Sequence, residues 1–324
     1  FIEIETCVNQ EFVSKGFKLS YKQVLQNPNT SFSFERTIEL NKVKTVPLGE
    51  IASFSLGIKT SDDKRFIFSE RKDDDCYLFL RGRNIKRWNK PENNEWLWYK
   101  PELICEKPGG RPRIFENFVV DKKIVIQDIA QEIVATFDYQ KYLCNDTLNI
   151  IFNIKPPFSM DFILVLLNSK LINCWFSKTF PAGLHIKINQ LAEIPIPVSD
   201  VSHEQIRVAL SSLADKMLSL NVDLQKSVQR FLKRVQENLN PAKISSTLEN
   251  FYTLEFADFV KEMAKQKVKL SLKQQDEWEE YFAEYKTDCV ALSEEIAATD
   301  NEINRLVYKL YDLTDEEIAI VEGK

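Results

Sequence analysis

The sequence predicts a mixed α+β domain followed by long, antiparallel α-helices of coiled-coil type. Short strand-like runs alternate with polar breaks up to about residue 198, and two long apolar seams follow. The charge changes at the same place, because residues 1–200 carry 27 basic and 25 acidic side chains, whereas residues 201–324 carry 16 and 23. We therefore expect a connecting segment over residues 1–45, the α+β domain over 46–198 and a helical spacer over 199–324.

Strands are predicted where β-branched and aromatic residues form short runs between polar, Pro or Gly breaks. These runs cover residues 31–34, 66–68, 77–80, 123–126, 133–137, 148–152 and 185–188. A longer apolar stretch over 159–176 has the spacing of one continuous helix. Pro195 and Pro197 stand at alternate positions and end the domain, because proline stops both a helix and a central strand.

The second part reads as helical throughout. Ser202 and Gln205 form a predicted capping box ahead of a seam that runs from Ile206 to Leu239. A shorter apolar helix is expected over 248–263. The second seam, over 278–313, repeats steps of four and three residues, so the two rods should pair antiparallel as a spacer or a dimerisation arm. A further capping box at residues 314–317 predicts a short terminal helix.

Composition excludes several classes of protein. The chain has only 8 glycines in 324 residues, and none of them forms a GxGxxG or GxxxxGK loop for a nucleotide phosphate. His185 and His203 are the only histidines, which makes a His-rich zinc site or a Ser-His-Asp triad improbable. The six cysteines lack any CxxC pair, so we expect reduced thiols in a cytoplasmic protein.

The ends of the chain and its apolar runs lead to two further expectations. The sequence opens on Phe1 rather than methionine, which suggests a fragment of a longer protein. No apolar run reaches the length of about 18 residues that a membrane span requires. We therefore expect no membrane partner.

Basic and aromatic residues are interleaved between residues 64 and 113. This window holds 13 basic and 8 acidic side chains, together with Trp88, Trp96 and Trp98. Such a mixture suits contact with a phosphate backbone and exposed bases. The alternative is that the cations solvate a sheet face while the tryptophans pack beneath it, and Trp88 in particular is expected to be packed.

The sequence contains only weak matches to catalytic motifs. Asp62 with the Glu70–Lys72 string could hold a divalent metal as in a nuclease, but in a chain with 28% charged residues this spacing arises by chance. Residues 153–158 only superficially resemble the adenine-binding loop of amino-methyltransferases, since no Asn or Asp directly precedes Pro156. We expect no catalytic residue, no metal site and no cofactor in this chain.

Several stretches, taken in order, resemble the TaqI-like C-terminal specificity domain of type IIG restriction-modification enzymes. They are Val46–Ile51, Gly57–Ser61, Phe79–Trp88, Tyr142–Leu148, Leu166–Asn173 and the closure over Ile188–Pro197, with a similar tail over Glu302–Glu317. The resemblance implies a target recognition domain for double-stranded DNA, with helical spacers behind it. It also implies a bacterial parent enzyme whose upstream part, joined through residues 1–45, methylates adenine with S-adenosylmethionine and is often fused to a Mg-dependent endonuclease.

The sequence also leaves other interpretations of the function open. Specificity subunits of type I systems pass in the same way into a long helix, although they carry two recognition domains, and bacteriophage-exclusion methyltransferases share this C-terminal domain. A protein-interaction module is the competing class, in which the helical arm forms a homodimer and the basic face only solvates a sheet. A metal nuclease in its own right is a third class, and it would depend on Glu70.

The candidate contacts to DNA are arginines and lysines in loops of the first domain, with a second, weaker group near the predicted turn at 181–183. They are Arg83, Lys86, Arg87, Lys107, Arg111 and Arg113 in the first group and Lys178, His185 and Lys187 in the second. Lysines would contact phosphates, and Arg83, Arg87, Arg111 and Arg113 could also read guanine in the major groove. Gly109 and Gly110 would either let the backbone approach DNA or form an ordinary turn.

Overall fold

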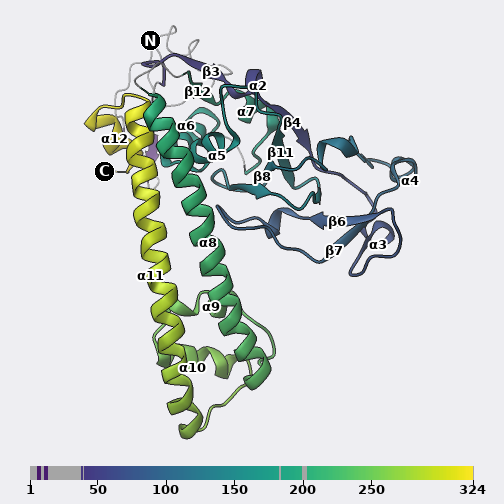
Figure 1. Cartoon of the computed structure of the whole chain (residues 1–324), viewed down its shortest axis with the longest axis vertical. Helices are drawn as coiled ribbons and strands as arrows, with labels where there is room; N and C mark the ends of the chain where they lie inside the picture. The colour runs from purple at the N-terminus through teal and green to yellow at the C-terminus, as the bar shows by residue number, and fades with distance from the viewer. Residues whose placement is uncertain are drawn as a thin grey trace.

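The structure is a computed structural model that describes residues 6–8, 11–13, 38, 40–181, 184–198 and 203–323. Figure 1 shows a sheet-bearing body, from which a long two-helix arm projects. This arrangement confirms the predicted fold class of an α+β domain followed by antiparallel helices. The predicted strand at 31–34, the Ser202 cap and residues 182 and 183 of the predicted turn lie outside the described residues.

The body is built on two four-stranded sheets and two short strand pairs. The first sheet is antiparallel, in the order β4 (Ser53–Leu56), β11 (Leu148–Phe152), β8 (Lys123–Gln127) and β9 (Ala135–Asp138). The second has the order β10 (Leu143–Cys144), β6 (Cys76–Leu80), β7 (Glu95–Trp98) and β5 (Ile67–Phe68), with β10 parallel to β6. The pairs are β3 (Thr45–Pro47) with β12 (Pro195–Pro197) and β1 (Thr6–Val8) with β2 (Glu11–Val13).

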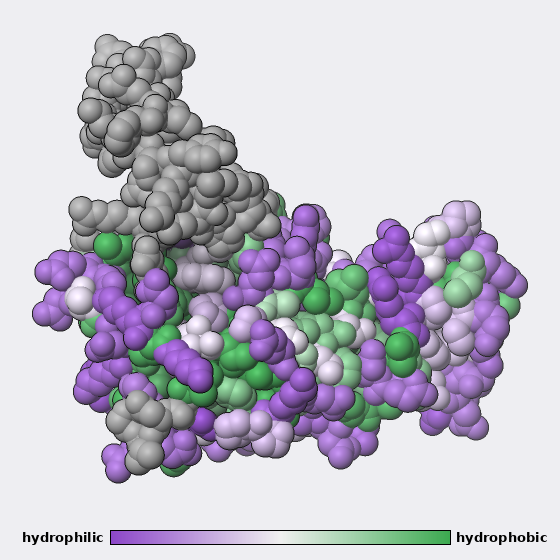
Figure 2. Space-filling model, turned by 90° about the horizontal axis from the view of Figure 1, so that it is seen from above, coloured by the Kyte–Doolittle hydropathy of each residue, from purple (hydrophilic) through white to green (hydrophobic). Residues whose placement is uncertain are grey.

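Short helices connect these strands and complete the body. They are α2 (Leu48–Ile51), α3 (Asp63–Phe66), η2 (Gly82–Asn84), α4 (Pro101–Cys105), η3 (Phe115–Asn117) and α7 (Ile188–Ala192). Seen from above in Figure 2, the end of the body away from the arm is predominantly hydrophilic. No helix within the described ranges combines the length and the apolar character that crossing a bilayer requires.

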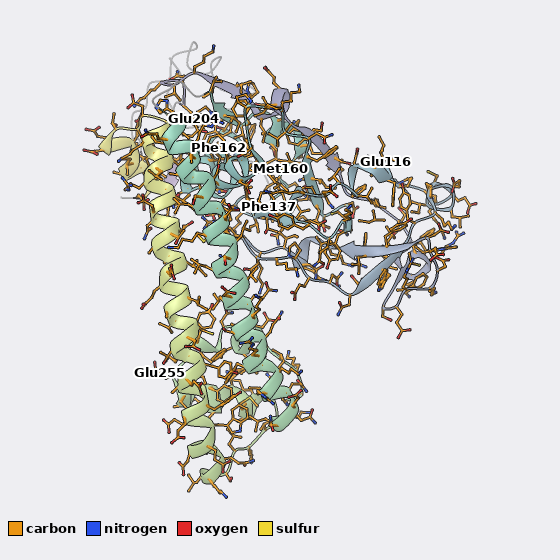
Figure 3. All side chains as sticks on the ribbon, in the orientation of Figure 1. Glu116, Phe137, Met160, Phe162, Glu204 and Glu255 are labelled. Atoms are coloured by element: carbon orange, nitrogen blue, oxygen red, sulfur yellow. The ribbon has the colours of Figure 1, made fainter. Side chains whose placement is uncertain are left out.

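The first sheet is buried on both faces, which explains why β8 and β11 carry consecutive apolar residues at Ile124–Ile126 and Ile150–Phe152. Ile124 and Ile126 of β8 face one core cluster, and Val125 between them faces the second. Figure 3 places Phe137, Met160 and Phe162 where the sheet meets the helices, and Met160 packs against both clusters. Alternation along each strand therefore divides the body into two cores.

Most of the strand predictions that fall on described residues are confirmed within a few residues. The runs at 77–80, 123–126 and 148–152 are β6, β8 and β11, and the run at 133–137 becomes β9 from Ala135 onward. Phe66 ends α3, so only Ile67 and Phe68 of the run at 66–68 are extended. The prediction of a strand over 185–188 was wrong, because His185 forms a single bridge with Ile129 and α7 begins at Ile188.

The apolar stretch at 159–176 was predicted as one helix, and this was wrong. It forms α5 (Met160–Asn168) and α6 (Lys170–Thr179), which meet at Ser169. Ser169 is extended, with φ −75° and ψ 149°, and its hydroxyl accepts a hydrogen bond from the Ile172 amide while donating to the Leu166 carbonyl. A serine that satisfies groups of both helices ends one and caps the next, which periodicity alone does not reveal.

The arm consists of α8 (Glu204–Leu239) and α11 (Leu272–Leu310), which run antiparallel as predicted (Figure 1). Near the body, Leu210 and Met217 of α8 and Ile303 of α11 belong to the first core cluster. The terminal helix α12 (Asp315–Val321) begins with the predicted capping box of Thr314 and Glu317. The arm is therefore rooted in the core of the body.

The far end of the arm has its own aromatic core around Phe231. The Phe231 ring stacks on Phe251 with centroids 3.8 Å apart and also contacts Phe259 and Phe282. The prediction of a single helix over 248–263 was wrong, because the chain forms α9 (Ser246–Glu249), η4 (Phe251–Thr253) and α10 (Phe256–Lys265) instead. These short pieces turn the chain so that its aromatic residues surround Phe231.

Polar contacts also join the side of the arm to the body. Arg87 forms an ion pair with Asp300 of α11, and Lys86 lies 3.7 Å from the carboxylate of Glu249. Gln229 of α8 donates a 2.9 Å hydrogen bond to Glu92. These contacts hold the loop after β6 against the arm.

We expect the Arg87–Asp300 pair to couple the body to the arm. A double-mutant cycle of Arg87→Ala and Asp300→Ala, followed by urea unfolding, should give a coupling free energy of about 1 kcal/mol, because both groups are partly shielded from water. The exposed Arg71–Asp74 pair serves as the matched cycle and should show much weaker coupling. Equal coupling in the two cycles would contradict the proposed link.

Candidate nucleic-acid interface

Two loops meet where the parallel strands β6 and β10 end. The loop after β6 begins at Arg81, and the loop after β10 begins at Asn145, whose amide donates to the Leu80 carbonyl over 2.9 Å. The Gly82 amide donates a 2.8 Å hydrogen bond to the Thr147 hydroxyl, which joins the two loops directly. Gly57 approaches the same place, because a Cβ at this position would lie 1.7 Å from the Asn145 carbonyl oxygen.

Arg83 projects from a turn that is fixed on both sides. The Gln127 side-chain amide donates to the carbonyls of Gly82 and Ile85 over 2.9 and 2.8 Å, and the Arg81 amide donates to the Asn84 side chain over 3.0 Å. The Arg83 side chain itself is 71% exposed, with Glu95 at 3.6 Å as its ion-pair partner. Hydrogen bonds already order the backbone of this turn. The exposed guanidinium could therefore contact a base with little further loss of backbone conformational entropy.

Arg81 has a structural role next to it. Its guanidinium forms ion pairs with Glu95 at 2.7 Å and Asp63 at 2.9 Å. Partial burial opposes the charged form, but the hydrogen bonds to these two carboxylates raise the pKa of Arg81 above its usual value. Both carboxylates are therefore engaged by Arg81, which leaves Arg83 as the more available cation of this turn.

Three cations gather beside these loops without carboxylate partners. Lys59 and Arg111 face each other across a bridge, with backbone hydrogen bonds of 3.0 and 2.7 Å, and Arg113 follows two residues later. Within the described residues, no carboxylate forms an ion pair with Lys59, Arg111 or Arg113. We call these three residues the cation cluster.

The surroundings of Arg113 disfavour its positive charge. The pKa of Arg113 is lowered by partial burial and by the nearby charge of Arg111, and Asp146 only partly opposes this shift. The Arg113 Nε also donates to the Gly57 carbonyl over 3.3 Å, which holds the guanidinium close to the loops. Such an arrangement gains stability when an anion neutralises the crowded positive charge.

A cavity of about 360 Å³ lies between the segments that follow β6, β8 and β10. It is lined by Arg81, Gly82, Arg83, Gln127, Ile129, Asn145 and Thr147. Ile129 bridges to His185, so His185 lies at the rim of this cavity. The His185 Nδ1 pairs with Asp128 at 2.9 Å, which turns Nε2 of the exposed ring away from that carboxylate.

The remaining predicted residues are placed elsewhere. Lys86 and Arg87 contact the arm, as described above, and Lys178 lies on α6. Lys107 pairs with Asp62 at 2.8 Å, and this hydrogen bond lowers the pKa of the carboxyl. Lys187 is exposed at the start of α7, two residues after His185. Arg83 lines the cavity, His185 is bridged to the cavity residue Ile129, and Arg113 lies near Arg111 and Asp146, whereas Lys86 and Arg87 contact the arm.

Sequence reasoning missed three residues of this face. Lys59 stands 52 positions before Arg111, and only the backbone bridge shows that the two are neighbours. Gln127 and Ile129 lie just after the strand predicted over 123–126 and carried no signal of their own. The stretch Gly57–Ser61 did contribute to the family resemblance, but this gave no indication that its lysine joins the cation cluster.

Gly109 and Gly110 form a turn whose backbone geometry and packing require glycine. Gly109 has φ +81°, which favours glycine, and a Cβ on Gly110 would lie 1.9 Å from the Ile104 carbonyl oxygen. The glycines therefore let this loop pack on α4. Trp88 is buried, at 2% exposure, as expected from the packed alternative.

The described residues hold their possible metal ligands apart from one another. They contain no group of three or more His, Cys, Asp or Glu side chains placed to hold an ion. Asp62, the first residue of the nuclease-like string, is engaged by Lys107. This face therefore combines exposed cations, one apolar side chain and fixed backbone turns.

The chain is similar to proteins of restriction-modification systems. The type IIL restriction-modification enzyme MmeI, solved in complex with DNA, is 13% identical with a TM-score of 0.35, and the match covers 81% of this chain and 37% of that chain. The S subunit of a type I restriction-modification system from M. genitalium is 16% identical with a TM-score of 0.35, covering 68% of this chain and 52% of that chain. No curated protein matches the sequence.

Family models match both parts of the chain. Residues 203–307, which include most of the arm, match a domain of unknown function (DUF8810). Residues 77–196 match the TaqI-like C-terminal specificity domain, and they include β6 to β12 with the turn that carries Arg83. The sequence resemblance to a TaqI-like C-terminal specificity domain is therefore confirmed over residues 77–196.

Proposed function

We propose that the body binds duplex DNA and recognises a target sequence through the face formed by the cation cluster, Arg83 and His185. The cation cluster carries this proposal, because two neighbouring guanidinium groups and a lysine form no ion pair with any carboxylate in the part of the chain that the structure describes. Lys59, Arg111 and Arg113 would contact phosphates and set the register on the duplex. Arg83 would reach a guanine edge in the major groove from its fixed turn.

The charge division along the chain supports the same orientation. Residues 201–324 carry 16 basic and 23 acidic side chains, so the arm is repelled by phosphates while the body is not. Arg87 and Lys86 are turned toward acidic groups of the arm and would position it. In this arrangement the arm acts as a spacer, which keeps the DNA-binding face at a set distance from whatever the arm contacts.

Duplex binding should fall steeply with salt. If the three residues of the cation cluster each neutralise one phosphate, affinity should drop roughly 40-fold between about 50 and about 200 mM salt. Fluorescence anisotropy with a labelled duplex and the full chain measures this slope. Absence of binding at low salt, or binding that does not respond to salt, would contradict the proposed face.

A second part of the proposal concerns the longer protein to which this chain belongs. We propose a type IIG enzyme in which an upstream adenine methyltransferase, using S-adenosylmethionine, and a Mg-dependent endonuclease precede this chain. The sequence resemblance over residues 46–197 and the matched specificity domain support it. The gene upstream of Phe1 tests it: an Asn-Pro-Pro-Tyr motif is expected there, whereas a second recognition domain in the same reading frame would indicate a type I specificity subunit instead.

A further inference from the structure

Ile129 occupies an unusual place for an exposed apolar side chain. It is 52% exposed, lines the cavity together with Arg83 and forms a backbone bridge with His185. Single exposed apolar residues are common on protein surfaces and need no special reason. Its position on the proposed DNA-binding face, rather than its exposure, makes it informative.

The backbone around Ile129 is rigid. The Asp128 amide donates to the Thr147 carbonyl over 2.9 Å, and the Ala130 amide donates to the Leu184 carbonyl over 2.9 Å. The Ile186 amide donates to the Asp128 carbonyl over 2.7 Å on the other side. These hydrogen bonds hold the backbone of Ile129 in place, and β-branching restricts the χ1 rotamers of its side chain.

The polar groups that line the cavity are mostly engaged within the protein. The Gln127 amide nitrogen binds two carbonyls of the Arg83 turn, and the Thr147 hydroxyl accepts from Gly82. The Asn145 side-chain oxygen accepts from the Thr147 amide over 3.0 Å. What the cavity offers a ligand is thus a guanidinium donor from Arg83 and an apolar surface from Ile129.

This pair of groups matches a defined pattern in the major groove. Guanine presents two acceptors, O6 and N7, which suit an arginine, and thymine presents the C5-methyl group, which suits an aliphatic side chain. Resting on the proposed DNA-binding function, we propose that Ile129 contacts the C5-methyl group of a thymine next to the base pair that Arg83 reads. Ile129 is then a specificity-determining residue that contributes through shape and apolar contact rather than charge.

Removal of the thymine methyl group tests this inference directly. Duplexes that bind the full chain are first enriched from a random-sequence library, and thymine is then replaced by uracil, which deletes only the methyl groups. Loss of one apolar contact should weaken binding of the wild-type chain roughly fourfold. Ile129→Ala should weaken binding of the thymine duplex by a similar factor and should bind the thymine and uracil duplexes equally.

Leu184→Ala is the matched control. Leu184 is 55% exposed and adjoins the same bridge, but the cavity is lined by Ile129 and not by Leu184. This variant should keep the wild-type ratio between the thymine and uracil duplexes. Thermal unfolding followed by circular dichroism should show that both variants fold like the wild type, since neither side chain is buried.

The outcomes separate this inference from the proposed function. Enriched duplexes without thymine, equal wild-type affinity for the thymine and uracil duplexes, or an unchanged uracil effect in Ile129→Ala would each overturn the role of Ile129 while leaving DNA binding intact. Failure to enrich any duplex at low salt would overturn the proposed function and this inference together.

Discussion

Reversing the charges of Arg111 and Arg113 together should abolish duplex binding. The Arg111→Glu and Arg113→Glu double variant removes two cations from the cation cluster and places two carboxylates against the phosphates. The affinity at low salt should fall by at least about 100-fold, because two attractive contacts become repulsive. Anisotropy titration of the full chain against one labelled duplex measures the loss.

A matched reversal on the arm separates local contacts from the effect of net charge. Lys233→Glu with Lys273→Glu makes the same change in total charge on exposed positions of α8 and α11. It should change the affinity by less than about threefold, since these sites are far along the arm and screened by salt. If both double variants lost binding equally, net charge rather than the cation cluster would govern it, and the proposed face would be wrong.

Removing the negative charge of Asp138 should destabilise the body more than any surface change. Lys123 and Asp138 form an ion pair of 2.5 Å, with side chains 0% and 1% exposed. Asp138 also accepts hydrogen bonds from the Gln140 and Tyr142 amides, and Lys123 donates to the Phe118 carbonyl over 2.6 Å. Asp138→Asn leaves the Lys123 ammonium without its counter-charge in an apolar core, which costs about 3–5 kcal/mol.

Urea unfolding of the wild type and of two further variants checks this interpretation. Lys123→Met combined with Asp138→Asn should recover more than half of the loss, because no unpaired charge then remains buried. Asp121→Asn, which breaks the exposed pair of Asp121 with Lys141, should leave the unfolding midpoint unchanged. A loss below about 1 kcal/mol for Asp138→Asn would show that the buried charge tolerates isolation.

Local sequence patterns accounted for the arm helices and for three central strands. The apolar residues of α8 and α11 recur at helical spacing, and β6, β8 and β11 are short β-branched or aromatic runs between polar breaks. The failures occurred where one polar residue or a non-local contact ended an element. Ser169 divides an apolar stretch by capping, and the aromatic shell of Phe231 breaks residues 248–263 into short pieces.

The candidate site shows the same division. Arg83, Arg111, Arg113 and His185 were predicted as DNA contacts from residue type and loop position; in the structure Arg83 lines the cavity, His185 is bridged to the cavity residue Ile129, and Arg111 lies near Arg113. Lys86 and Arg87 had the same residue types but face the carboxylates of Glu249 and Asp300. An isolated sequence does not reveal which cations are already paired, because their partners lie more than 160 positions away along the chain.

By itself, the sequence determined the class of this protein: an α+β domain with the order of motifs of a specificity domain, a long antiparallel arm, and a net positive first part before an acidic second part. Only the tertiary structure decided which distant residues lie next to one another. The pairing of Lys59 with Arg111 and of Ile129 with His185 depends on bridges between distant segments. Local residue patterns specify helices and strands, whereas a binding face is made by contacts between segments that the chain order keeps apart.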